Sequence, residues 1–100
     1  MSNPEKKVEN SIKRYLDQLG AYYVKIHGSA YMPAGTPDII ACVDGYFIGI
    51  EVKKPKGGKV TEIQKFQIKK IQNARGVAFV ATSKEQVESE LRKRGILETD

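Results

Sequence analysis

The dipeptide Asp44-Gly45 lies between two apolar segments, PDIIACV at residues 37–43 and YFIGIEVKK at residues 46–54. Asp-Gly between two such segments is the strongest short-range signal of a β-hairpin, because both residues tolerate the positive φ angles of a tight turn. Counting outward from this turn along both strands places Asp38 directly opposite Glu51. The pair falls at a non-hydrogen-bonded position, where facing side chains approach most closely. The hairpin therefore predicts two carboxyl groups in contact.

Two facing carboxylates destabilise a sheet unless they share a proton or a cation lies between them. Lys53 follows Glu51 by two residues and points to the same face, because strand side chains alternate. Pro37 has no N–H group, so pairing loosens opposite Val52 and Asp38 lies where the strand frays. Carboxylate oxygens suit hard divalent cations that keep several waters, so we expect Mg²⁺ or Mn²⁺ here. The alternatives are a turn-initiating Asp38 and a solvent-exposed Glu51 and Lys53.

Helix and strand signals on both sides of the hairpin predict an α/β fold. Asn3 caps a helix that begins at Pro4 and ends at about Leu19, and residues 21–27 form a strand. Beyond the hairpin, we expect a helix over residues 61–74, a strand over residues 77–82 and a helix over residues 83–94. The order is αβββαβα, with a mixed sheet flanked by helices. We expect residues 1–100 to form a single domain, since chains of this length rarely divide.

The first predicted helix carries one apolar stripe that faces the sheet. Its members recur with the helical period and are Val8, Ile12, Tyr15, Leu16 and Leu19. Glu9 falls at the margin of this stripe, so its carboxylate is expected to reach over the edge of the core.

The basic residues concentrate in one part of the chain. The formal net charge is +5, and residues 53–75 hold eight lysines and arginines against Glu62 alone. Such a segment is typical of proteins that bind a phosphate backbone, although a solvated lysine-rich surface is the alternative. The residues expected to bind nucleic acid are Lys54, Lys56, Lys59, Lys65 and Lys69.

Other sequence features limit the class of protein. The longest purely apolar run, IIACV, is too short to cross a bilayer, and the N-terminus has no apolar segment of signal-peptide length. We therefore expect no membrane partner and a cytoplasmic protein, in a bacterial host cell if a phage encodes it. The single cysteine, Cys42, is expected to be a small buried apolar residue. No pattern suggests an organic cofactor.

The residues of the hairpin and its flanking segments resemble the motif of a known family. Pro37-Asp38 and Glu51-Val52-Lys53 resemble the PD-(D/E)xK nuclease motif. Together with Gly35-Thr36, the helical Glu9 and the segment VTEIQ at residues 60–64, they make nearly the whole chain similar to the virus-type replication-repair nuclease (VRR-NUC) domain. The chain is most similar to the stand-alone, phage-type members. The resemblance implies a restriction-endonuclease-like core.

The resemblance also implies roles for individual residues. Glu9, Asp38 and Glu51 would coordinate Mg²⁺ or Mn²⁺, with the carbonyl of Val52 as a further ligand. Catalysis would depend on Asp38, Glu51, Lys53 and Gln64. Lys53 would orient the attacking water and balance charge on the transition state, and Gln64 would hold the substrate or the site. Thr61-x-x-Gln64 is also a helix capping box, so a structural role for Gln64 remains an alternative.

The predicted function is that of a metal-dependent, structure-specific DNA endonuclease. By resemblance to minimal family members, the leading prediction is a homodimeric Holliday-junction resolvase, since two copies related by a dyad suit a symmetric branched substrate. One alternative is a single-strand, flap or restriction-type nuclease, which would share the chemistry. The other is a non-enzymatic nucleic-acid-binding module, which would not need the carboxylates.

Overall fold

The computed structural model describes residues 3–98 and contains the seven predicted elements in the predicted order. They are α1 (Pro4–Gln18), β1 (Tyr22–Lys25), β2 (Ile39–Val43), β3 (Tyr46–Val52), α2 (Glu62–Asn73), β4 (Val77–Ala81) and α3 (Lys84–Lys93). The α/β fold class predicted from the sequence is confirmed. Within residues 3–98, every helix is too short or too polar to cross a membrane.

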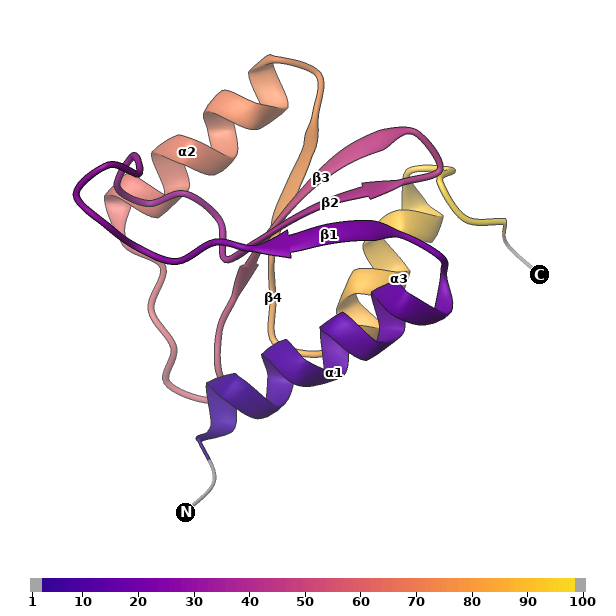
Figure 1. Ribbon diagram of the computed structural model, residues 1–100, viewed down its shortest axis with the longest axis horizontal. Coiled ribbons are helices and arrows are strands. Elements are labelled where there is room, and N and C mark those ends of the chain that lie inside the picture. The colour runs from indigo at the N-terminus through magenta and orange to yellow at the C-terminus, as the bar shows by residue number, and fades with distance from the viewer. Residues whose placement is uncertain (1–2, 99–100) are drawn as a thin grey trace.

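The four strands form one mixed sheet in the order β1-β2-β3-β4. The first three strands pair antiparallel, whereas β4 runs parallel to β3. A parallel pair needs a crossover connection, and α2 supplies it. Figure 1 shows α2 on one side of the sheet and α1 with α3 on the other. The sheet therefore separates residues of α1 from residues of α2.

The hairpin has the predicted turn and the predicted register. Asp44 and Gly45 have φ angles of 51° and 86°, and the pairs run from Val43–Tyr46 to Ile39–Ile50. Positive φ at both central residues matches the right-handed twist of the flanking strands. The count from the turn is therefore correct over the whole length of β2.

The pairing ends one residue earlier than predicted, so Asp38 does not form a cross-strand pair with Glu51. The carbonyl of Asp38 instead accepts a hydrogen bond from the Ile26 N–H at 2.7 Å. Its carboxylate oxygen Oδ2 accepts one from the Val52 N–H at 2.7 Å. In an uninterrupted hairpin, the Val52 N–H would bond to the carbonyl of Pro37. The side chain of Asp38 accepts that hydrogen bond instead, which fixes the carboxylate at the start of β2.

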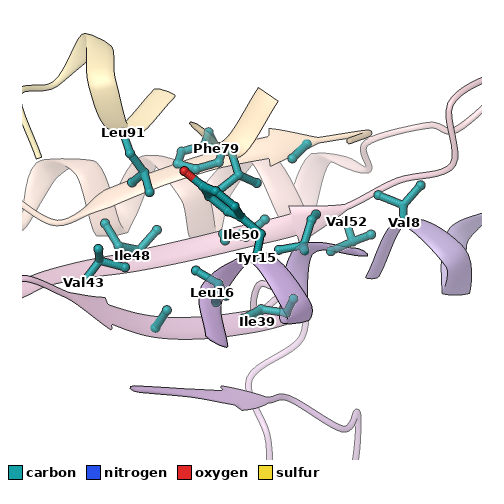
Figure 2. Packing of buried hydrophobic residues seen from close by; sticks show 14 of the residues in the cluster. Val8, Tyr15, Leu16, Ile39, Val43, Ile48, Ile50, Val52, Phe79 and Leu91 are labelled. Carbon is teal, nitrogen blue, oxygen red and sulfur yellow. The ribbon is translucent and has the colours of Figure 1, made fainter. Parts of the chain in front are cut away.

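The core lies between the sheet and the layer of α1 and α3. The apolar stripe of α1 is buried as predicted at Val8, Ile12, Tyr15 and Leu16. These residues pack against side chains of β2, β3, β4 and α3, which Figure 2 shows meeting in one layer. Ile48, Ile50 and Val52 supply the face of β3 that points into this core. Glu51 lies between two of them in sequence and therefore points to the α2 side.

The opposite face of the sheet is only partly covered. Helix α2 packs over β3 and β4 and has no fully buried residue. Tyr22, Cys42 and Phe47 pair side by side across β1, β2 and β3, and all three are exposed. The prediction that Cys42 is buried is therefore wrong. Its neighbours in β2 point into the core, so alternation turns Cys42 toward the face that α2 does not reach.

Candidate active site

Asp38, Glu51 and Lys53 lie together where β2 and β3 separate. Glu51 is only 2% exposed, and the Lys53 ammonium lies 3.6 Å from its Oε2. The pKa of Glu51 is raised to about 8: burial is the largest cause, the hydrogen bond and negative charge of Asp38 add to it, and Lys53 opposes the shift. The adjacent Asp38 carboxyl group disfavours a negative charge on Glu51, because two adjacent negative charges repel. A bound cation would relieve the same repulsion.

Gln64 caps α2 and also contacts Glu51. Its side-chain oxygen accepts a hydrogen bond from the Thr61 N–H at 3.0 Å, and its backbone N–H donates to the Thr61 hydroxyl at 3.2 Å. These two bonds form the capping box of α2. Its side-chain nitrogen donates to Glu51 Oε2 at 3.2 Å. An amide offers an acceptor and two donors, so capping and contact with the site coexist.

Glu9 lies on the other side of the sheet, among three lysines. Its side chain is almost fully buried, and its carboxylate is 3.1 Å from Lys6, 2.7 Å from Lys13 and 3.1 Å from Lys25. Burial has the largest single effect on the pKa of Glu9 and raises it. The hydrogen bonds to Lys13, Lys25 and Lys6 together outweigh burial and lower that pKa to about 2. Glu9 is therefore a carboxylate with its charge already compensated.

Lys25 connects Glu9 to the rest of the site. Its ammonium lies 3.1 Å from Glu9 Oε1 and 3.6 Å from Asp38 Oδ1. Sequence reasoning missed Lys25, because its place beside Asp38 depends on the pairing of β1 with β2. No tight turn joins these two strands, so their register cannot be counted from the sequence. From the sequence, only the alternation of side chains within β1 can be predicted, and it places Lys25 on the same face as Tyr23.

The predicted metal ligands lie in two separate groups. Within the part of the chain that the structure describes, no three side chains of Asp, Glu, His or Cys lie close enough to hold one ion. Asp38 and Glu51 are adjacent, and the Val52 carbonyl follows Glu51 along β3. Glu9 is separated from them by the Lys25 ammonium. The adjacent pair offers hard oxygen donors, one of them deeply buried, and this donor chemistry fits Mg²⁺ or Mn²⁺.

The loop over residues 28–36 is fixed beside Asp38. Gly35 has a φ of 81°, and a Cβ atom there would lie 2.6 Å from the Ile63 carbonyl oxygen. Only glycine fits such a close approach in this conformation. Gln67 adds a hydrogen bond from its side-chain nitrogen to the Ala34 carbonyl at 3.1 Å. These contacts with α2 leave a hollow of about 210 Å³ that reaches from the loop to Asp38.

The lysines expected to bind nucleic acid are exposed on the loop after β3 and on α2. They are Lys54, Lys56, Lys59, Lys65 and Lys69. The loop folds back over the site, since a Cβ atom at Gly58 would lie 3.1 Å from the Cβ of Lys53. Lys65 pairs with Glu62 at 3.1 Å on the exposed surface of α2. The basic surface and the carboxylate pair are therefore neighbours.

Comparison with known proteins gives two matches of interest. A family model described as "Archaeal holliday junction resolvase (hjc)" matches residues 2–100. A solved structure titled "VRR_NUC domain" is similar with a TM-score of 0.76 and 24% sequence identity, and the match covers 92% of this chain and 97% of that chain. At this identity, the similarity shows the fold. Comparison with curated proteins gives no match.

Proposed function

Because the chain belongs to the archaeal Holliday junction resolvase (Hjc) family of PD-(D/E)xK-type nucleases, we propose that it resolves four-way DNA junctions with Mg²⁺ or Mn²⁺ as a homodimer. Membership of this family makes it a nuclease. Metal dependence, the junction substrate and the dimer are parts of the proposal. So are the site residues Glu9, Asp38, Glu51, Val52, Lys53 and Gln64.

The observation that carries the proposal is the buried Glu51 with three different partners. Asp38 supplies a second carboxyl group, Lys53 an ammonium at 3.6 Å and Gln64 an amide donor at 3.2 Å. A structural ion pair would need only one cation for one carboxylate. A second carboxyl group beside a buried one weakens the fold unless it serves a bound cation. This cost favours a metal-dependent enzyme over a binding module.

The residues divide the work of phosphodiester hydrolysis. A bound divalent cation would polarise a phosphoryl oxygen and lower the pKa of a bound water. Asp38 and Glu51 would hold that cation, with the Val52 carbonyl as a further ligand. The Val52 N–H orients Asp38 and the Gln64 amide orients Glu51, so both carboxylates are fixed before substrate binds. Lys53 places a positive charge where negative charge develops on the phosphoryl group.

The phosphate backbone would be held by the lysines on both sides of the site. Lys54, Lys56 and Lys59 lie in the loop that follows Lys53, and Lys65 and Lys69 lie on the helix that carries Gln64. Binding through these residues should weaken as salt rises, because each neutralised phosphate releases counterions. They would position the DNA without reading its sequence.

The uncovered sheet face supports the homodimer. Tyr22 and Phe47 are 74% and 48% exposed on the sheet, and Ile63 and Phe66 are 46% and 57% exposed on α2. Beside Phe47, a hollow of about 470 Å³ is lined by α2 residues that include Ile71 and by residues 74–76, which follow α2. We assign this surface, called the α2 face below, to a second copy of the chain. A twofold axis through this face would relate two active sites. Resolution of a symmetric junction requires cleavage of two strands, one by each site.

The test is a cleavage panel of linear duplex, single strand, flap and four-way junction, each with Mg²⁺ or Mn²⁺. We expect preferential junction cleavage that chelation abolishes and that Lys53→Ala lowers by about 100-fold or more. Lys7→Ala, an exposed lysine of α1, is the control and should cleave normally.

Other outcomes separate the alternatives. Preference for the flap or single strand would replace the junction as substrate and keep the chemistry. Junction binding without cleavage of any substrate would contradict the enzyme and favour a binding module.

A further inference from the structure

We propose that Lys25 is the resident counter-ion of the acidic site, that its ammonium holds the cation position between Glu9 and Asp38, and that a divalent cation must displace it. This inference rests on the proposed function, since it concerns the same metal site. It assigns to Lys25 the control of how tightly the site binds metal. Lys25 is thus a positioning residue for the carboxylates of Glu9 and Asp38, and its ammonium competes with the divalent ion for them.

The geometry places Lys25 between two carboxylates from different elements. Its ammonium is 3.1 Å from Glu9 Oε1, on α1, and 3.6 Å from Asp38 Oδ1, at the start of β2. The backbone fixes this position, because Lys25 pairs with Ile39 and the next N–H, that of Ile26, bonds to the Asp38 carbonyl at 2.7 Å. Any cation that joined Glu9 to Asp38 would lie where the ammonium lies.

Charge balance argues against a merely structural ion pair with Glu9. Lys6 and Lys13 already lie 3.1 Å and 2.7 Å from Glu9 Oε2, which leaves Oε1 to Lys25. One carboxylate does not require three lysines. Asp38, in contrast, has its Oδ2 bound to the Val52 N–H, and among residues 3–98 Lys25 is the cation that pairs with its Oδ1. The third lysine therefore serves Asp38 as much as Glu9.

Displacement follows from the charges and from the length of the side chain. A divalent ion on Asp38 and Glu51 would lie a few ångströms from the ammonium, and like charges at that distance repel strongly in a half-buried site. The Lys25 side chain is 24% exposed and has a flexible four-carbon stem, so its ammonium can move into solvent. Its departure would free one oxygen of Glu9 and one of Asp38. Those oxygens could then face the ion.

The test measures Mn²⁺ binding by isothermal titration calorimetry, without DNA. Lys25→Met keeps most of the apolar stem and removes the charge, and we expect it to bind Mn²⁺ at least about tenfold more tightly than the wild type. Lys13→Met is the matched control. Lys13 is 26% exposed and contacts Glu9 without contacting Asp38, so its removal should change affinity less than threefold. Asp38→Asn is the negative control, because removal of a proposed metal ligand should abolish Mn²⁺ binding.

A second measurement uses the wild-type protein, so it does not depend on how the variants fold. The Nζ nitrogen resonance of Lys25, followed by NMR during Mg²⁺ titration, should shift with saturation of the site, while that of Lys13 shifts less. A Lys25 resonance that stays unchanged while Mg²⁺ binds would overturn the inference.

The calorimetric outcomes separate this inference from the proposed function. If the wild type binds Mn²⁺ and Lys25→Met binds no more tightly than Lys13→Met, the counter-ion role is overturned and the metal site stands. If wild type and both variants fail to bind Mn²⁺, the metal site itself is contradicted and the counter-ion role with it.

Discussion

At the scale of single residues, Gln64 uses the two ends of its amide for different purposes. The oxygen closes the capping box with Thr61 and the nitrogen donates to Glu51. The capping box begins α2 at a fixed residue, so the donor end reaches Glu51 from a fixed helix start. One residue thereby couples the position of α2 to the orientation of a proposed metal ligand.

The two ends of Gln64 are separable by substitution. Gln64→Glu keeps an oxygen for the cap but replaces the donor with a negative charge beside Glu51, so cleavage should fall at least about tenfold with little loss of stability. Thr61→Ala is the counterpart: it should cost about 1 kcal/mol of unfolding free energy and retain cleavage below the melting temperature. Junction cleavage and thermal unfolding of both variants check this. Equal cleavage loss in both would show that Gln64 acts only through the helix cap.

Glu51 should make the stability of the metal-free protein depend on pH. Its pKa is raised from 4.5 to about 8 in the folded state, mainly by burial and by Asp38. Between these values the folded state binds more protons than the unfolded state, so the free energy of unfolding falls as pH rises from about 4.5 to about 8. Urea unfolding in a chelating buffer measures the slope. Glu51→Gln should flatten it, and an unchanged slope in that variant would assign the effect elsewhere.

At the scale of secondary structure, the three helices end with the same backbone conformation, but the residue that adopts it differs in α2. Each ends with a residue in the left-handed conformation followed by a hydrogen bond back to the last turn. In α1 and α3 that residue is a glycine, Gly20 or Gly95, whereas in α2 it is Arg75 with a φ of 74°. The sequence predicted that this helix extends to about residue 74, and the structure ends it at Asn73. Gly76 is needed for space, because a Cβ atom there would lie 2.8 Å from Ile71.

Arg75→Gly should therefore stabilise the protein. Glycine adopts positive φ without the steric strain of a side chain, and we expect a gain of roughly 0.5–1 kcal/mol, or about 4 °C in Tm. Gly95→Ala is the reverse experiment at the end of α3, where a Cβ atom meets nothing within 4 Å. It should cost about 1 kcal/mol from backbone strain alone. Differential scanning calorimetry at equal protein concentration measures both, and a destabilised Arg75→Gly would contradict the backbone argument.

At the scale of the whole molecule, the sheet buries one face fully and the other in part. The layer of α1 and α3 covers the first face, and α2 covers only β3 and β4 on the second. On this partly covered side Phe47 remains exposed on the sheet, and Phe66 is exposed on α2. Exposed apolar side chains on neighbouring elements favour the proposed interface with a second copy of the chain.

Substitution on the α2 face should separate assembly from folding. Phe66→Glu places a charge on an exposed position, so the fold should persist while a dimer interface would lose its apolar contact. Sedimentation velocity should show a dimer for the wild type and a monomer for this variant. Tyr31→Glu is the control, since Tyr31 is 97% exposed on the loop over residues 28–36 and should remain dimeric.

A cruciform plasmid gives the functional counterpart of the same prediction. A dimer cuts both strands in one encounter and yields linear DNA, whereas a monomeric variant should yield mainly nicked circles. A wild type that sediments as a monomer, or a Phe66→Glu variant that stays dimeric, would contradict the assignment of the α2 face.

The sequence by itself determined the elements, their order and the local geometry of the hairpin. Asp44-Gly45 set the register of β2 and β3, and the alternation along β3 placed Glu51 and Lys53 on one face. The Thr61 to Gln64 spacing gave the start of α2. These features depend on neighbours within a few residues, where backbone geometry leaves few choices. They were sufficient to bring Asp38, Glu51 and Lys53 to one place, whereas the contact of Gln64 with Glu51 depends on how α2 packs against the sheet.

Only the tertiary structure decided what lies between elements that no tight turn connects. It stopped the pairing of β2 with β3 at Ile39 and Ile50, so that the Asp38 carboxylate accepts the hydrogen bond of the Val52 N–H. It also placed the Lys25 ammonium between Asp38 and Glu9. It also left Cys42 exposed, because α2 covers β3 and β4 but not β2 on that face of the sheet. The residue pattern of β2 alone does not indicate which strands a helix covers. Each outcome depends on how β1, α1 and α2 pack against the hairpin. Packing between distant segments is set by the whole core, so no local pattern of residues contains it.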